Sequence, residues 1–400
     1  MGDAAGVRSL TESATPGEVA RAAAAYLRGI ANPERFVREL LERAGIEVGG
    51  PAAHDLVVRD RRFYARVARD GALGLGESYV EGWWDSPAVD QMITRLHRAN
   101  LPEVVRKNWR YLLSVLRARL LNLQSAVRAF QVAEHHYDIG NDLYRAMLDR
   151  RMAYTCAYWK DARTLDEAQE AKLELVCRKL QLRAGMRVLD LGCGWGSFAR
   201  YAAERHGAVV TGYSVSREQV ALGRELCAGL PVELLLDDYR NARGRFDRVV
   251  SIGLMEHVGF KNYRAYMEVV DRCLARGGLS LVHTIGSAVS EPVCDPWTQK
   301  YTFPNGHLPS MAQLARAMEG LFTIDDVHNF GTHYDPTLMA WHGNFVAAWP
   351  GLAARYGERF RRIWSYYLLM SAAAFRARYI HLFQVVLSRA DSPAPECRVA

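Results

Sequence analysis

The 400-residue sequence lacks the features of a membrane-spanning or disulfide-stabilised protein. Its seven cysteines are odd in number and scattered, with no C-x-x-C pair and no Cys/His cluster at zinc spacing. This usage favours a reduced, cytosolic protein without a metal site. No apolar run approaches the length of a membrane span, and Asp3 and Glu12 interrupt the N-terminus where a signal peptide would be apolar. Gly6 stands where a myristoylation signal needs Ser or Thr. Any membrane contact is therefore expected to be peripheral.

Acidic residues are too few to balance the basic ones. Lys and Arg number 51 against 44 Asp and Glu, giving a formal charge of +7 and a pI near 9.0. Such an excess favours an anionic partner, either phospholipid or nucleic acid. Most of it lies in residues 101–130, which also carry an apolar stripe at helical spacing. This segment could lie in a lipid headgroup region, or pack in a core or a dimer contact. A second basic group comprises Arg355, Arg359, Arg361 and Arg362.

The N-terminal third of the chain has helical periodicity. Residues 1–15 are small and polar and are predicted to be disordered. Apolar spacing predicts helices over 17–29, 33–44, 60–70, 88–99 and 102–130, with a glycine-rich link at 71–86. We therefore expect a small, mostly helical N-terminal domain over residues 16–130, followed by a catalytic domain over 131–400.

After residue 165 the pattern changes to strands that alternate with helices. Strands are predicted over 187–191, 208–213, 232–236, 246–252, 278–285, 322–329 and 380–388. Such alternation predicts an α/β fold with a mostly parallel seven-stranded sheet, covered by helices on both faces. An insertion over about 290–378, rich in Trp, Tyr and Phe, could roof a pocket at the carboxyl ends of the strands. Ligands bind there in such sheets, so five residues at or just past strand ends should converge: Asp190, Ser214, Asp238, Glu256 and His283.

The most informative stretch is RVLDLGCGWGSFA, residues 187–199, which predicts a strand turning directly into a helix. Gly192, Gly194 and Gly196 would let the backbone approach a ligand closely. The helix N-terminus can hold a carboxylate, and Asp190 is placed for a hydroxyl or an ammonium. A dinucleotide site would need a third glycine at Ser197 and an acid ending the next strand, and neither is present. An S-adenosylmethionine site fits better, and a tight turn without a ligand stays open.

Ionisable residues follow two neighbouring predicted strands. Glu256 stands in LMEHVG and His283 in LVHTIG, while Cys156 lies in YTCAYW and Tyr334 in the aromatic insertion. Taken singly, each has a structural alternative: a lone cysteine is usually a small buried residue, and a tyrosine usually packs in a core. Glu256 and His283 could equally be hydrogen-bonded caps. Their joint position at one expected cofactor mouth favours an active site.

Eight motifs in order make the chain similar to the cyclopropane-fatty-acyl-phospholipid synthase family, itself related to the mycolic acid cyclopropane synthases. The motifs cover nearly the whole chain after about residue 55: GLGESYVEGWWD, HHYDIGNDLY, YTCAYWKDA, VLDLGCGWG, FDRVVSIGLMEHVG, HTIGS, KYTFPNGHLPS and TLMAWHGNF. The resemblance implies a class I S-adenosylmethionine-dependent methyltransferase fold. It implies transfer of the cofactor's methyl group to a cis double bond of a phospholipid acyl chain, followed by proton loss and ring closure.

The resemblance also implies roles for individual residues. A bound bicarbonate ion is expected to act as the base, held by Cys156, Glu256, His283, Tyr334 and the backbone N–H of Ile285. Cys156 would then be a ligand of that ion and not a nucleophile. The residues expected to contact S-adenosylmethionine are Tyr154, Thr155, Asp190, Gly192, Gly194, Ser214, Gln219, Asp238 and Tyr239. The family commonly has serine at the position of Thr155, which keeps the hydroxyl.

The substrate implies that the protein docks on the inner face of a membrane, and the resemblance implies a homodimer. A sister activity stays open, in which a lipid C-methyltransferase leaves a methyl branch or an exocyclic methylene instead of a ring. A non-catalytic lipid-binding protein of the same fold is a second alternative. Nucleic-acid methylation is disfavoured because LMEHVG, and no D/N-P-P-Y/F motif, follows the fourth predicted strand.

Overall fold

The structure is a computed structural model that describes residues 31–99, 139–290 and 295–399. The predicted disorder at 1–15 and the helices at 17–29 and 102–130 lie outside the described residues. The predicted helices at 33–44 and 88–99 are confirmed as α2 (Pro33–Arg43) and α4 (Val89–Arg98). Asn32 caps α2 by accepting a hydrogen bond from the Arg35 N–H at 3.2 Å, and Pro33 occupies the first turn, where no donor is needed.

The prediction of a glycine-rich link over residues 71–86 is wrong. Helix α3 (Arg62–Val80) runs through most of it, with a kink at Gly71, where φ is 59°. Strand β1 (Val57–Val58) before this helix and strand β2 (Trp84–Asp85) after it pair antiparallel. A Cβ atom at Gly76 would overlap the Trp297 ring and come within 2.8 Å of Tyr366. The glycines of this motif therefore serve close packing of a helix and not a loop.

All seven predicted strands are present in one sheet. They are β3 (Arg187–Leu191), β4 (Val209–Ser214), β5 (Val232–Leu236), β6 (Phe246–Ile252), β7 (Leu274–Ser287), β8 (Thr323–Asn329) and β9 (Ile380–Ser388). Their order is β5-β4-β3-β6-β7-β9-β8, and β9 runs antiparallel to both of its neighbours. From β3 the sheet first grows on one side, through β4 and β5, and the chain then returns to add β6 on the other side of β3. The strand order therefore reverses beside β3, which is where such sheets bind ligands.

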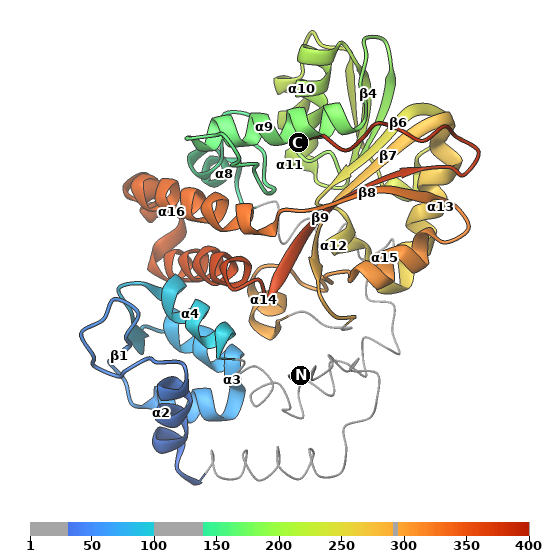
Figure 1. The fold of residues 1–400 in the computed structure, drawn as a ribbon. Coiled ribbons are helices and arrows are strands. Elements are labelled where there is room, and N and C mark those ends of the chain that lie inside the picture. Colours follow the sequence, from blue (N-terminus) through green and yellow to red (C-terminus); the bar gives the residue numbers. More distant parts are fainter. Residues whose placement is uncertain (1–30, 100–138, 291–294, 400) are drawn as a thin grey trace, which may run out of the picture.

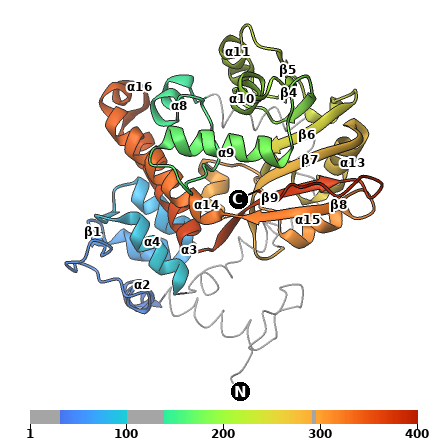
Figure 2. The same ribbon diagram turned by 45° about the horizontal axis from the view of Figure 1, so that its top comes forward.

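Helices cover both faces of the sheet (Figures 1 and 2). One face packs under α9 (Leu165–Lys179), α10 (Ser197–His206) and α11 (Arg217–Leu226), with Val188, Val210 and Val250 in that core. The other packs under α12 (Met255–Val258), α13 (Tyr263–Cys273) and α15 (Met311–Met318), with Leu189, Leu191 and Val249. Neighbouring residues of each strand thus enter different cores, as the pleat requires.

A third core joins the N-terminal helices to the rest of the chain. The insertion at 290–378 is divided by β8 into α14 (Pro296–Tyr301) with α15, and a long α16 (Tyr334–Arg376) that kinks at Gly357. Figure 1 shows the two halves of α16 between α8 (Asn141–Met147) and α4. Trp341 and Trp364 of α16 share one hydrophobic cluster with Phe63 and Trp84 of the N-terminal part. In the described residues these helices therefore have no core of their own.

Three short 3-10 turns complete the described part: η1 (Tyr239–Asn241), η2 (Phe260–Asn262) and η3 (Gly331–His333). Among the helices of residues 31–99, 139–290 and 295–399, none is both long and apolar enough to span a bilayer.

Candidate active site

A cavity opens at the carboxyl ends of β3, β4 and β6. It is lined by all nine residues that the sequence analysis assigns to S-adenosylmethionine: Tyr154, Thr155, Asp190, Gly192, Gly194, Ser214, Gln219, Asp238 and Tyr239. They come from five separate stretches of the chain, which the sheet brings to one edge. The placement agrees with one shared ligand, whose contacts with them stay a prediction.

The glycine turn between β3 and α10 forms one wall of this cavity. Gly192, Gly194 and Gly196 have φ values of 84°, 56° and 78°, which other residues adopt only with strain. A Cβ atom on Gly192 would stand 3.0 Å from the Cβ of Leu254, which also lines the cavity. Glycine is thus required at position 192 for two reasons, the torsion angles of the turn and the close approach of Leu254.

Asp190 supplies a carboxylate oxygen without a partner. Its side chain is buried at the end of β3, and Oδ2 makes no hydrogen bond within the described structure. Burial raises the pKa of Asp190 to about 7, against the opposing charge of Lys172. A buried acceptor facing a cavity is costly unless a ligand donates to it. The hydroxyl and ammonium groups of S-adenosylmethionine are such donors, so the residues present fit this molecule.

Lys172 is a cavity residue that the sequence analysis missed. It lies on α9 with 1% of its surface exposed, and its Nζ donates to Thr155 Oγ1 at 2.8 Å. Burial lowers the pKa of Lys172 to about 8, although Asp149, Cys156 and Asp190 oppose this. Gln169, one turn earlier, donates to the Thr155 carbonyl at 2.8 Å. Two polar residues three apart on an otherwise apolar helix face are the signal that could have revealed them.

Polar side chains near the ends of β4 and β5 are held in place by hydrogen bonds within the protein. The Ser214 hydroxyl donates to Gln219 Oε1 at 3.1 Å, which leaves the amide NH₂ of Gln219 for another acceptor. Asp238 accepts from the backbone N–H of Arg240 at 2.9 Å and from its guanidinium at 2.8 Å. Both arrangements hold their side chains in one position at the cavity wall before any ligand binds.

Glu256 and Ile285 are brought into direct contact. Glu256 Oε1 accepts the Ile285 N–H at 2.6 Å, whereas the buried Oε2 has no partner within the described structure. Burial raises the pKa of Glu256 to about 7, although the bond from Ile285 lowers it. The backbone N–H of Ile285, which is expected to hold bicarbonate, thus already donates a hydrogen bond to the Glu256 carboxylate. An anion bound here would have to share that donor with Glu256.

The prediction that His283 ends its strand is wrong. It lies inside β7 because pairing with β9 extends that strand to Ser287, and His283 faces Gln384 in this pairing. It does lie opposite Ile252, the last residue of β6. Its Nδ1 is 3.2 Å from Gln384 Nε2, and its buried Nε2 has no partner in the described part of the chain. Burial lowers the pKa of His283 well below its usual value, so the ring is neutral.

Cys156 is fully buried, and its thiol donates to the Ala157 carbonyl at 3.3 Å. Burial raises the pKa of the thiol well above its usual value. A neutral thiol is a poor nucleophile, since the thiolate is the reactive form. The side chain is therefore suited to donating a weak hydrogen bond.

Tyr334 reaches the same neighbourhood from the start of α16. Its ring lies 4.5 Å from that of Phe375 and 6.0 Å from that of Trp341, which in turn lies 5.1 Å from Tyr154. Thr337, one turn along α16, accepts the Ala157 N–H at 3.2 Å, next to Cys156. The residues expected to hold bicarbonate, Cys156, Glu256, His283, Ile285 and Tyr334, are not among those that line the cavity, so their union in one base site stays a prediction.

The fold and the cavity define the class of the protein. A seven-stranded sheet with this order, a glycine turn after β3 and an unpartnered carboxylate at the cavity make it an S-adenosylmethionine-dependent methyltransferase. Residues 124–385 match the family described as mycolic acid cyclopropane synthetase. The chain belongs to this family.

Individual relatives agree with that assignment. The chain is 51% identical over 355 residues to the cyclopropane-fatty-acyl-phospholipid synthase of Escherichia coli strain K12, covering 89% of this chain and 93% of the relative. It is 38% identical to a probable fatty acid methyltransferase of Pseudomonas putida, covering 64% and 68% respectively. Among solved structures it resembles mycolic acid cyclopropane synthase CmaA1 complexed with SAH and CTAB. Identity there is 31% and the TM-score 0.60, over 64% of this chain and 97% of the other.

Proposed function

We propose that the protein is a cyclopropane-fatty-acyl-phospholipid synthase. It transfers a methyl group to a cis double bond of a phospholipid acyl chain and closes the ring by removing a proton from the added carbon. The observation that carries this proposal is Glu256, a buried carboxylate with a free oxygen and a pKa raised to about 7. The cation left after methyl transfer must lose a proton before the ring can close, and a base of this pKa is matched to neutral pH.

An alkene is a weak nucleophile, so the site must align it with the donor and exclude water. Bound S-adenosylmethionine supplies an electrophilic methyl group on its sulfonium. The new bond from the lipid to this carbon leaves a positive charge on the neighbouring lipid carbon. Tyr154, Trp341 and Tyr367 form an aromatic group beside the cavity, where Tyr154 and Tyr367 share a hydrogen bond of 3.0 Å. Aromatic faces stabilise such a cation without trapping it.

Loss of the proton then forms the third bond of the ring. In our proposal bicarbonate receives this proton, held at Glu256 Oε2 and His283 Nε2. Two buried polar atoms without partners support this role, because a small hydrogen-bonding anion would satisfy both. Tyr334 would donate to the same ion, as would Cys156 once its S–H turns away from the Ala157 carbonyl, and Glu256 would orient the ion or accept its proton.

The sister reaction is the second candidate, because one relative is a probable fatty acid methyltransferase and not a ring-forming enzyme by name. Purified protein given S-adenosylmethionine and vesicles of a cis-monounsaturated phospholipid decides between them. Mass spectrometry of the released fatty acids should show the gain of one methylene unit with loss of the olefin. The same mass gain with an olefin retained would establish the methylene product and overturn ring formation.

We further infer peripheral contact with an anionic membrane surface, at the inner face of a cytoplasmic membrane. Arg43, Arg95 and Arg98 line a depression between α2, α4 and the end of α16, and no carboxylate is among its lining residues. Arg95 interacts electrostatically with Asp55, whereas no ion pair within 4 Å joins Arg43, Arg95 or Arg98 to another described residue. The basic group Arg355, Arg359, Arg361 and Arg362 is different, because all four are paired within the protein.

The double variant Arg95→Gln/Arg98→Gln should bind phosphatidylglycerol vesicles more weakly. Each basic side chain near an anionic surface contributes about 1 kcal/mol, so two should lower affinity roughly 30-fold. Vesicle co-sedimentation at increasing salt measures this. The matched control is Arg359→Gln/Arg361→Gln, which should retain nearly full binding. Equal losses in both variants would contradict a specific role for the depression. The expected homodimer stays a prediction that sedimentation velocity tests.

A further inference from the structure

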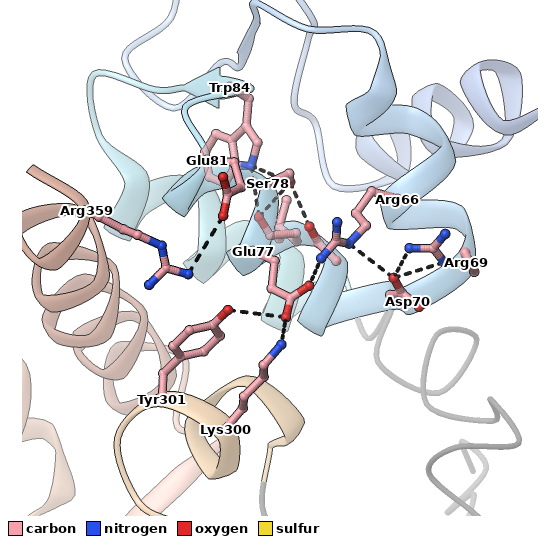
Figure 3. Close-up of polar contacts among 12 residues, drawn as sticks. Arg66, Arg69, Asp70, Glu77, Ser78, Glu81, Trp84, Lys300, Tyr301 and Arg359 are labelled. Carbon is pink, nitrogen blue, oxygen red and sulfur yellow. Dashed lines mark hydrogen bonds and ion pairs between the residues drawn. The ribbon is translucent and has the colours of Figure 1, made fainter. Parts of the chain in front are cut away.

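A buried carboxylate connects the N-terminal helices to the wall of the cavity. Glu77 lies on α3, in the motif GLGESY, and its side chain is 5% exposed. It pairs with Arg66 of its own helix and with Lys300 of α14, and it accepts from the Tyr301 hydroxyl at 3.3 Å. Figure 3 shows these donors converging on Glu77 from both sides. One carboxylate therefore ties two segments more than 200 positions apart.

Close packing between α3 and α14 adds to the ion pair between Glu77 and Lys300. Gly76 precedes Glu77 and lies directly against the ring of Trp297, the second residue of α14. Trp297 is fully buried, and its ring is 4.8 Å from that of Tyr366 on α16. The short helix α14 is thus held along both its apolar and its charged side by α3. Its position depends on the N-terminal helices.

The residues that follow α14 along the chain line the S-adenosylmethionine cavity. Pro304 and Asn305 line the cavity, and Asn305 has a φ of 61°, a strained value for a residue other than glycine. The ring of Phe303 lies 5.8 Å from that of His257, another cavity residue. Two residues after Asn305, the His307 N–H donates to the main-chain carbonyl of Glu256 at 2.8 Å. A shift of α14 would therefore move both the cavity wall and the turn that carries Glu256.

Burial makes this contact far more consequential than a surface ion pair. Removing the charge of Glu77 takes the carboxylate partner from Lys300 and leaves Arg66 with Asp70 alone, beside a closely packed helix, which is costly. One turn along α3, Glu81 faces Arg359 at 3.8 Å, with both side chains about half exposed. Such an exposed pair contributes little. The chain thus supplies a matched control on the same helix, visible in Figure 3.

We propose that Glu77 is a positioning residue, through which the N-terminal helices set the wall of the S-adenosylmethionine cavity and the placement of Glu256. The assignment of Glu256 rests on the proposed function, whereas the assignment of the cavity rests on the class of the protein. Glu77 touches no reacting atom in this scheme. It acts on them through α14 and the segment that follows.

The test measures S-adenosylmethionine binding by calorimetry on the full chain without lipid. The result is then independent of which lipid product the enzyme forms. Glu77→Gln should weaken binding roughly tenfold and also lower the melting temperature, because its cationic partners lose a buried charge. Lys300→Met should weaken binding as much with the melting temperature nearly unchanged, because Lys300 is 55% exposed and its replacement does not disturb a core. The double variant should be no worse than Glu77→Gln alone, since that change already removes the contact with Lys300. Glu81→Gln should bind normally.

Unchanged affinity in both Glu77→Gln and Lys300→Met would overturn the proposal. So would additive losses in the double variant, or an equal loss in Glu81→Gln. If Glu77→Gln is too unstable to purify, Lys300→Met decides alone. Hydrogen exchange of residues 296–307 provides a second measurement, and it should rise in the variants while exchange in β3 and β4 stays constant. Uniformly faster exchange would mean a merely structural role and would also overturn the proposal.

Discussion

Glu256→Gln should lower turnover by about 10²–10⁴-fold, with nearly unchanged affinity for S-adenosylmethionine. Glutamine has the same shape and can still accept the Ile285 N–H, so the fold of α12 should survive. It cannot take up a proton or orient an anion as a carboxylate does. Steady-state kinetics with lipid vesicles and calorimetry without them separate the two effects.

The pH profile provides the internal control for this prediction. Because burial raises the pKa of Glu256 to about 7, its charged form is populated only above that value. Turnover of the unmodified enzyme should therefore rise as the pH increases through about 7, and the variant should lack this rise. Glu225→Gln, at an exposed position on α11, should behave as the unmodified enzyme. Equal losses of turnover and cofactor affinity in Glu256→Gln would mean that its role is misassigned.

Gly192→Val should abolish measurable binding of S-adenosylmethionine. The residue has a φ of 84°, and its Cβ would stand 3.0 Å from that of Leu254, another residue of the cavity wall, so valine would push Leu254 or the turn out of place. This displacement distorts the wall that the ligand is expected to contact, in addition to straining the turn. Calorimetry or equilibrium dialysis measures the loss.

Gly185→Val separates these two causes. Gly185 has nearly the same φ, 80°, but a Cβ there meets no atom within 4 Å. Both variants should lose stability from backbone strain, of order 1–3 kcal/mol; Gly192→Val should lose more because of its contact with Leu254, and it alone should lose binding. If both lose binding, then the effect comes from strain and not from the contact with Leu254.

Strand positions were predictable because each buried strand is a short apolar run bounded by turn residues. β3, β5, β6 and β9 begin and end where the sequence predicts. The residues assigned to S-adenosylmethionine line one cavity because parallel strands carry their following loops to one edge of the sheet. These are local patterns combined with one general rule of topology, and a single sequence contains both.

Other features depended on partners that are distant in the sequence. GALGLGESYV looks like a loop by composition, yet it is helical, because Trp297 and Tyr366 need glycine opposite them. His283 lies inside β7 because β9, about 100 positions away, extends the pairing. Lys172 was missed because a lysine in a helix usually faces solvent, whereas here the sheet edge and the segment holding Thr155 enclose it.

The amino-acid sequence by itself determined the order of the strands along the chain, the glycine turn and the identity of the chemical groups at each strand end, since all of these depend on neighbours along the chain. The tertiary structure alone decided which charges are buried and unpartnered, among them Asp190 Oδ2, Glu256 Oε2 and His283 Nε2. It also decided that Glu77 binds α14 to the N-terminal helices. The reason is physical: burial and pairing depend on which surfaces meet in space, and that is a property of packing between distant segments.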